Sequence, residues 1–155
     1  MKKSVALICL VLLFVLQAAA QSNDACSAMK TIMNALTSKE FDKVVDWNKK
    51  LGMFRYASKV NVPGFRNCQF FTVESVVYFE ADYEGSNIAD NRQMLDDLGW
   101  IIAPCFTGFT SSRSGNQREW FKDGNPSAGR ITVYDRGNGK YLELEISGVS
   151  RRSVP

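Results

Sequence analysis

The sequence predicts an α+β fold with two layers, in which an antiparallel sheet of about five strands is packed on one face by helices. Apolar residues recur at helical spacing in residues 26–36 and again before Pro104, and they alternate with polar residues in 76–84 and 130–147. An Asn-Gly pair at 138–139 lies between the last two alternating segments, and this pair is a strong hairpin signal. Short connections between the strands favour antiparallel pairing.

The first 20 residues are typical of a cleavable secretory signal. Lys2 and Lys3 form a positive start, residues 5–15 are all apolar, and three alanines at 18–20 provide a cleavage site. The apolar run is shorter than the ~20 residues that a spanning helix needs. We therefore expect a signal peptide at 1–20, a single α+β domain at 21–150 and a frayed tail at 151–155. The product would be secreted or periplasmic, with no membrane span after cleavage.

Charge and composition exclude several function classes. The chain has 19 basic residues, 16 acidic residues and no histidine. Loss of the signal removes two lysines and no acid, so the remaining chain is nearly neutral and has no general attraction to nucleic acid. Without histidine, Ser–His and Cys–His catalysis and the common catalytic zinc sites are excluded. We expect no metal and no cofactor.

The N-terminal quarter reads as two helical segments. Asn23 or Asp24 can cap a helix over 26–36. Thr37 and Glu40 match a capping box that restarts a helix, which would end near Gly52. The apolar positions of the two segments are Met29, Ile32, Met33 and Leu36, and then Phe41, Val44, Val45 and Trp47.

The middle of the chain predicts a turn and a hairpin. Residues 54–60 are expected to be extended, and Pro63-Gly64 suits a type II turn. Strands over 67–73 and 76–84 can pair if Glu74-Ser75 is the turn. That register places Phe70 opposite Phe79, Thr72 opposite Val77 and Cys68 opposite Ala81 on the inner face.

The C-terminal half predicts one helix and three strands. Ser86 or Asn87 caps a helix that Pro104 ends, and its apolar stripe comprises Met94, Leu95, Leu98, Ile101 and Ile102. Residues 107–116 are expected to be a flexible loop. Strands follow at 117–122, 130–136 and 141–147, with a turn at 123–126. A turn at 138–139 places Ile131 opposite Ile146 and Val133 opposite Leu144 on one face. The other face then has Tyr134 opposite Glu143 and Thr132 opposite Glu145.

Three cysteines remain after signal cleavage, and an odd number allows one internal disulfide. We favour Cys26–Cys105, which joins the two long helices and leaves Cys68 as a buried thiol. Pairing of Cys68 with either of the others stays open, as does a disulfide-linked dimer.

An acidic stripe is expected on the open face of the sheet, at Glu80, Asp82, Glu84, Glu143 and Glu145. The simplest interpretation is a solvated face that pairs with Arg130, Arg136 and lysines across the strands. The alternatives are a cation site or a pair of glycosidase carboxylates. No residue is assigned as catalytic.

Exposed aromatic and basic side chains are the usual anchors of protein interfaces. The predicted interaction surface comprises Phe109, Arg113, Arg118, Trp120, Tyr134 and Tyr141. The favoured function is a secreted or periplasmic, non-enzymatic binding domain whose partner is another envelope or extracellular protein. The alternatives are a small carboxylate-dependent hydrolase and a structural surface protein.

Overall fold

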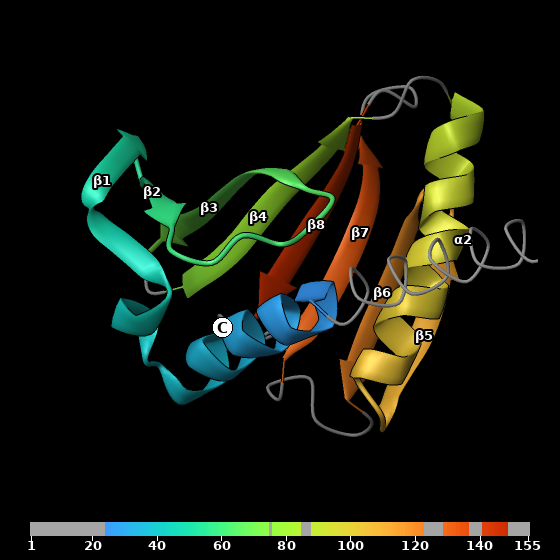
Figure 1. Cartoon of the computed structure of the whole chain (residues 1–155), viewed down its shortest axis with the longest axis horizontal. Helices are drawn as coiled ribbons and strands as arrows, with labels where there is room; N and C mark the ends of the chain where they lie inside the picture. Colours follow the sequence, from blue (N-terminus) through green and yellow to red (C-terminus); the bar gives the residue numbers. More distant parts are fainter. Residues whose placement is uncertain (1–23, 75, 85–87, 123–128, 137–140, 149–155) are drawn as a thin grey trace, which may run out of the picture.

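One antiparallel sheet of eight strands dominates the structure, a computed structural model that describes residues 24–74, 76–84, 88–122, 129–136 and 141–148. The strand order is β1-β2-β3-β4-β8-β7-β6-β5 (Figure 1). The strands are β1 (Val45–Gly52), β2 (Arg55–Ser58), β3 (Arg66–Val73), β4 (Val76–Glu84), β5 (Phe109–Ser114), β6 (Gln117–Lys122), β7 (Arg130–Arg136) and β8 (Tyr141–Ser147).

The described part of the chain is mostly β, so the predicted α+β class with about five strands covered by helices is wrong. The two edge strands account for much of the error. In β1 only Val45 is buried, and no residue of β5 is buried. A strand with little burial on either face lacks the apolar alternation by which strands are recognised. Residues 45–52 were therefore predicted as helix, and residues 109–114 as part of a flexible loop.

The first helix covers residues 24–38, and its end explains why the predicted restart fails. Lys39 is left-handed, with φ 59°, and the Glu40 N–H donates to the Ala35 carbonyl at 2.9 Å. This is the Schellman pattern that terminates a helix. The Thr37 hydroxyl donates back to the Met33 carbonyl at 2.9 Å, so it closes this helix and does not cap a following one. Only a short 3-10 turn, η1 (Phe41–Lys43), separates it from β1.

The helix over 24–38 and α2 (Ile88–Cys105) lie on the same side of the sheet (Figure 1). Both contribute to a single hydrophobic core with the strands. The helical members include Met29, Ile32, Leu36, Leu95, Leu98 and Ile102, and the strand members include Phe70, Phe79, Ile131, Val133, Leu144 and Ile146.

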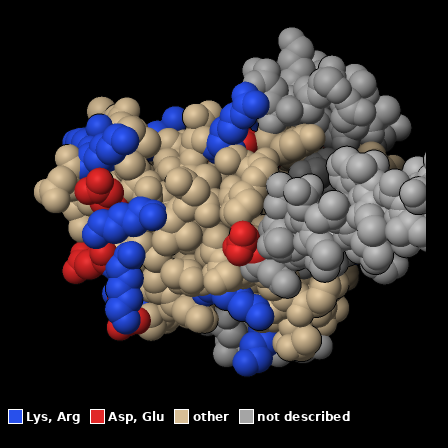
Figure 2. Space-filling view, viewed as in Figure 1, with Lys and Arg blue, Asp and Glu red and all other residues tan. Residues whose placement is uncertain are grey.

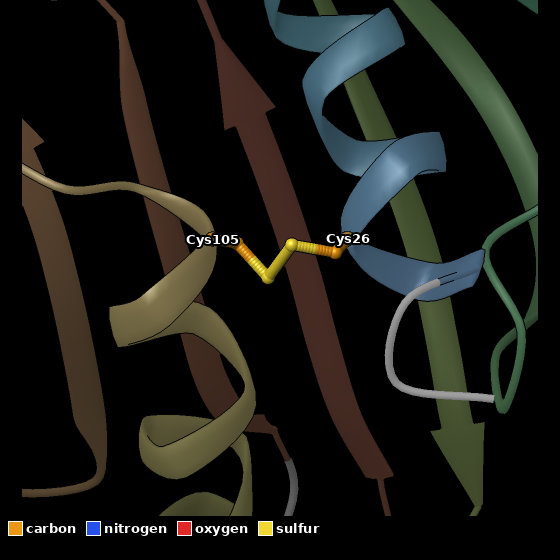
Figure 3. Close-up of a disulfide and its surroundings, with 2 residues drawn as sticks. All are labelled: Cys26 and Cys105. Carbon is orange, nitrogen blue, oxygen red and sulfur yellow. A yellow bond between two sulfur atoms is a disulfide. The ribbon is translucent and has the colours of Figure 1, made fainter. Parts of the chain in front are cut away.

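A disulfide joins Cys26 to Cys105 across the two helices, as predicted (Figure 3). The two Cα atoms are 5.4 Å apart, and 79 residues separate the cysteines in the sequence. Cys68 is a free, half-buried thiol that packs against the core. Burial is the main factor that raises the pKa of the Cys68 thiol.

The predicted β7–β8 register is confirmed, and the predicted β3–β4 register is confirmed over part of its length. In β3–β4, Phe70 pairs with Phe79 and Thr72 with Val77. An irregularity between Arg66 and Gln69 interrupts the ladder, so the expected pairing of Cys68 with Ala81 is not part of it. In β7–β8 every predicted pair forms, including Ile131–Ile146, Val133–Leu144, Thr132–Glu145 and Tyr134–Glu143.

The Pro63-Gly64 turn is also present. Gly64 has φ 85°, and the Phe65 N–H donates to the Val62 carbonyl at 3.0 Å. A positive φ at this third position defines a type II turn, and glycine adopts it without steric cost. The turn leads the chain from β2 into β3.

The topology repeats one pattern twice, although no repeat is visible in the sequence. A helix followed by a four-strand meander occurs first in residues 24–84 and again in 88–147. The last strands of the two halves, β4 and β8, pair in the middle of the sheet. As a result, the β4–β8 pair has three strands on each side and lies at the centre of the sheet.

Several predictions lie outside the described residues. These are the signal peptide at 1–20, the helix cap at 86–87, the turns at 123–126 and 138–139, the second residue of the Glu74-Ser75 turn, and the tail at 151–155.

Candidate functional site

The β4–β8 pair brings four carboxylates together in a two-by-two array. Glu80 lies directly opposite Glu145, and Asp82 lies directly opposite Glu143. Their strand neighbours Phe79, Ala81, Leu144 and Ile146 face the core, so all four carboxylates occupy the sheet face away from the helices. Carboxylates in directly opposed positions repel one another. The array must therefore be stabilised by protons, by cations or by hydrogen bonds.

Three of these carboxylates are buried, which corrects the expectation of a solvated face. Glu80, Glu143 and Glu145 are 8%, 7% and 6% exposed. Burial is the main factor that raises the pKa of Glu143 to about 7, and the charge of Glu80 raises it further. Arg136 opposes this effect, since its guanidinium lies 2.7 Å from Glu143 in an ion pair without hydrogen-bond geometry.

Amide side chains on β3 contact the two carboxylates of the array that lie on β4. The Asn67 amide donates to Asp82 at 3.2 Å, and the Gln69 amide donates to Glu80 at 3.5 Å. Of the arginines expected to pair with the stripe, Arg136 does so, whereas Arg130 lies 3.7 Å from Glu119 on β6. Glu84 pairs in register with Tyr141 at the end of the two strands.

The array offers a proton site and not a preformed metal site. In the described ranges, no group of three or more Cys, Asp or Glu residues is placed to hold a metal ion. A carboxyl group that keeps its proton near neutral pH reduces the repulsion among four close acids. The pKa of Glu143 is raised to about 7, so this carboxyl takes up a proton at lower pH and is paired with Arg136 when it is charged, while two amides donate to Asp82 and Glu80.

Replacing Glu143 with glutamine should remove a pH-dependent loss of stability. The pKa of Glu143 is raised from 4.5 to about 7, so the folded chain holds the proton more tightly than the unfolded chain does. This stabilisation is complete below pH 4.5 and is lost as the pH rises through 7. Because Arg136 is largely exposed, we discount the loss for solvent screening to about 1–2 kcal/mol.

Urea denaturation at about pH 5 and about pH 8 measures this difference. Glu143→Gln should show nearly equal free energies of unfolding at the two pH values and should exceed the unchanged protein at the higher one. Glu119→Gln, on the same sheet face but outside the array, is the matched control and should keep the original difference. An equal pH dependence of stability in all three proteins would contradict a raised pKa at Glu143.

The residues of the predicted interaction surface lie on two different faces of the sheet. Phe109, Arg113, Arg118 and Trp120 share the helix-covered face of β5 and β6, whereas Tyr134 pairs with Glu143 on the opposite face. Trp120 is only 1% exposed, and the Arg118 guanidinium lies 5.2 Å from its ring centre.

Arg113 and Phe109 also have contacts within the fold. Arg113 forms an ion pair with Asp96 of α2 at 3.0 Å, and Phe109 is half-buried against Phe106. Tyr141 pairs in register with Glu84 and Arg136 on the face opposite Trp120. The expectation of an outward tryptophan is therefore wrong, because β6 is an inner strand between β5 and β7 and one of its faces is under α2.

A different apolar surface is present along the β1–β2 hairpin and at its end. We call it the hairpin tip. It comprises Trp47, Leu51, Met53, Phe54 and Val73, which are 39%, 51%, 76%, 53% and 43% exposed. Among the residues whose side chains the structure describes, these are the exposed large hydrophobic ones. Val73 belongs to the tip because the neighbouring Thr72 N–H donates to the Phe54 carbonyl at 2.9 Å.

The hairpin tip is held in a defined shape. The Trp47 indole donates to Asp42 at 2.6 Å, and its ring packs edge-on against Tyr56 at 4.9 Å between centroids. Phe54 is left-handed, with φ 64°, which a bulky residue adopts only at a cost. The sequence does not reveal this site, because its pattern predicts a helix that ends near Gly52. The apolar pair Met53-Phe54 directly after Gly52 was the available signal, since turns are usually polar.

Comparison of the chain with protein-family models, with curated proteins and with solved structures finds no match. In the described residues, no helix is long and apolar enough to cross a membrane. The intramolecular disulfide is typical of proteins in oxidising compartments.

Proposed function

We propose that this protein is a secreted, non-enzymatic binding domain that contacts another extracellular protein through the hairpin tip. One observation carries the proposal: among the residues whose side chains the structure describes, every exposed large hydrophobic one lies on the β1–β2 hairpin or at the end of the neighbouring β3. Scattered apolar residues are normal on a surface, whereas a contiguous exposed group marks an interaction site. The signal-like N-terminus and the disulfide support an extracellular location.

A protein partner fits this end better than a lipid surface does. β1 is the first strand of the sheet order, so one row of its main-chain N–H and C=O groups faces away from β2. A partner strand can satisfy these groups by adding to the sheet edge. Hydrocarbon cannot satisfy them, because each unpaired main-chain group costs several kcal/mol there. The apolar side chains and the free strand edge together favour a polypeptide.

The charges beside the hairpin tip indicate the kind of partner segment that would bind there. Lys49, Lys50 and Arg55 are exposed on β1 and β2, and Figure 2 shows basic side chains together with a few acidic ones along this side of the molecule (left). Lysines on an edge strand oppose pairing with a second copy of the same edge, because like charges would face each other. We therefore expect a partner segment that combines apolar and acidic side chains.

The hairpin tip also loses little freedom on binding. Trp47 is already fixed by its hydrogen bond to Asp42 and by its contact with Tyr56. Side chains that are ordered before association avoid part of the entropy cost of an interface. Tryptophan and other aromatic residues in such positions often dominate binding energy.

The carboxylate array does not support the hydrolase alternative as well. Glu143 has the raised pKa that a general acid needs, but its side chain is only 9% exposed and is paired with Arg136. A substrate would have to displace that ion pair before it could reach the proton.

A photo-crosslinking residue placed at position 53 tests the proposal. We expect it to label one extracellular protein in the native secretion fraction, whereas the same residue at Ser112 on the opposite edge strand should not. The purified partner should then bind the unchanged chain in calorimetry. The double variant Leu51→Ser/Met53→Ser should weaken binding at least tenfold, which corresponds to about 1.4 kcal/mol.

The double variant should fold normally, because both side chains are exposed and such substitutions usually change stability by less than about 0.5 kcal/mol. Ser112→Ala is the matched surface control and should bind like the unchanged chain. Equal labelling from both positions would overturn the proposal. So would binding of the captured protein that is insensitive to Leu51→Ser/Met53→Ser, or tip-dependent binding to protein-free lipid vesicles.

A further inference from the structure

A cavity of about 340 Å³ opens between the helix over 24–38 and the segment that joins α2 to β5. Lys30 and Thr37 line it from the helix, Cys105, Phe106 and Phe109 line it from the end of α2 and beyond, and Lys122 lines it from β6. Its volume is at the lower end of the range of small-molecule pockets. The cavity is distant in the sheet order from the hairpin tip, since β6 and β1 lie in opposite halves.

The lining of the cavity combines two cationic side chains with two aromatic rings, and Lys122 pairs in register with Phe109. Lys30 and Lys122 are exposed and come from different elements, and none of the lining residues is acidic. The rings of Phe106 and Phe109 lie 5.3 Å apart, and Phe106 is 7% exposed. Two ammonium groups without a carboxylate in the same wall attract an anion, and the paired rings offer an apolar surface beside it.

We propose that this cavity binds a small organic anion with an aromatic body. Its carboxylate or sulfonate lies between Lys30 and Lys122, and its ring lies against Phe106 and Phe109. Ammonium groups bind such anions as point charges and tolerate different acid groups. This site is independent of the hairpin tip, so either proposal can fail without the other.

The disulfide links the two walls of this cavity. Cys105 is a lining residue, and its partner Cys26 lies in the helix that supplies Lys30 (Figure 3). An intact bond fixes the helix relative to the end of α2 before a ligand arrives. Reduction would leave that ordering to be achieved on binding, which lowers affinity. We therefore expect the oxidised chain to bind more tightly than the reduced chain.

Titration of the oxidised chain with 4-phenylbutyrate and with its neutral counterpart 4-phenylbutan-1-ol tests the proposal. We expect saturable binding of the acid, with NMR shift changes at residues that line the cavity, and much weaker binding of the alcohol. The double variant Lys30→Gln/Lys122→Gln should lower the affinity for the acid about tenfold and leave the affinity for the alcohol unchanged. Lys49→Gln/Lys50→Gln on β1 removes the same charge elsewhere and is the matched control.

Reduction with dithiothreitol should lower the affinity for the acid at least threefold, both in the unchanged chain and in Cys68→Ala. Equal affinity for the acid and the alcohol would overturn the proposal, as would equal effects of the two lysine double variants. Failure of the acid to bind the oxidised chain would overturn it as well. Far-UV circular dichroism of each variant excludes loss of folding as the cause.

Discussion

Replacing Cys26 and Cys105 together with alanine should lower the free energy of unfolding by about 4 kcal/mol. The two residues are 79 positions apart, so the bond closes more than half of the described chain into one loop. Loop closure removes conformational freedom from the unfolded chain, and the effect grows slowly with loop length. Because the whole protein is expected to be stable by only about 5–15 kcal/mol, this one bond is a large part of its stability.

Urea denaturation with and without dithiothreitol measures this effect. Reduction should lower the midpoint of the unchanged chain to that of Cys26→Ala/Cys105→Ala, and the double variant should not respond to the reductant. Cys68→Ala is the control, because this half-buried thiol is free and its loss should leave the response to reduction intact. A midpoint that does not move on reduction would contradict the predicted role of the bond.

The hairpins β3–β4 and β7–β8 could be predicted from the sequence because apolar residues that face the core alternate with polar residues on the other face. In β4 and β8 the pairs Phe79–Ile146 and Ala81–Leu144 face the core, and polar residues alternate with them. That alternation fixes register as well as direction. The edge strands β1 and β5 lack it, since they contact the sheet on one side only and bury almost nothing. Alternation in the sequence arises only where one face of a strand is buried, so it cannot indicate a strand that is exposed on both faces.

The same limit explains what was missed at the candidate sites. The positions of Glu80 and Glu143 on one face followed from alternation, but their burial did not. Burial depends on the number of flanking strands, and three strands on each side of the β4–β8 pair replace the smaller sheet that was expected. The hairpin tip could not be found while residues 45–52 were assigned to a helix.

Replacing Trp120 should have the second large effect on the free energy of unfolding. The result also tests whether this residue has a structural role or a binding role. Its ring is 1% exposed on β6, paired with Ile131, which is fully buried. Trp120→Ala should therefore cost about 3–5 kcal/mol, since it removes a large buried side chain and leaves a cavity. Trp120→Phe keeps a ring in the same place, and it loses an indole N–H that has no hydrogen-bond partner among the described residues. We expect it to cost less than half as much.

Urea denaturation and calorimetric binding of the partner are measured for both Trp120 variants and for Leu51→Ser/Met53→Ser at the hairpin tip. If Trp120 is structural and the tip binds the partner, the two sites should affect different quantities. Trp120→Ala should lose stability, and Trp120→Phe should bind the partner like the unchanged chain. The tip variant should keep its stability and lose binding, because its side chains contact solvent in the free protein. Weaker partner binding by a fully folded Trp120→Phe would instead place the contact surface on β6 and remove it from the hairpin tip.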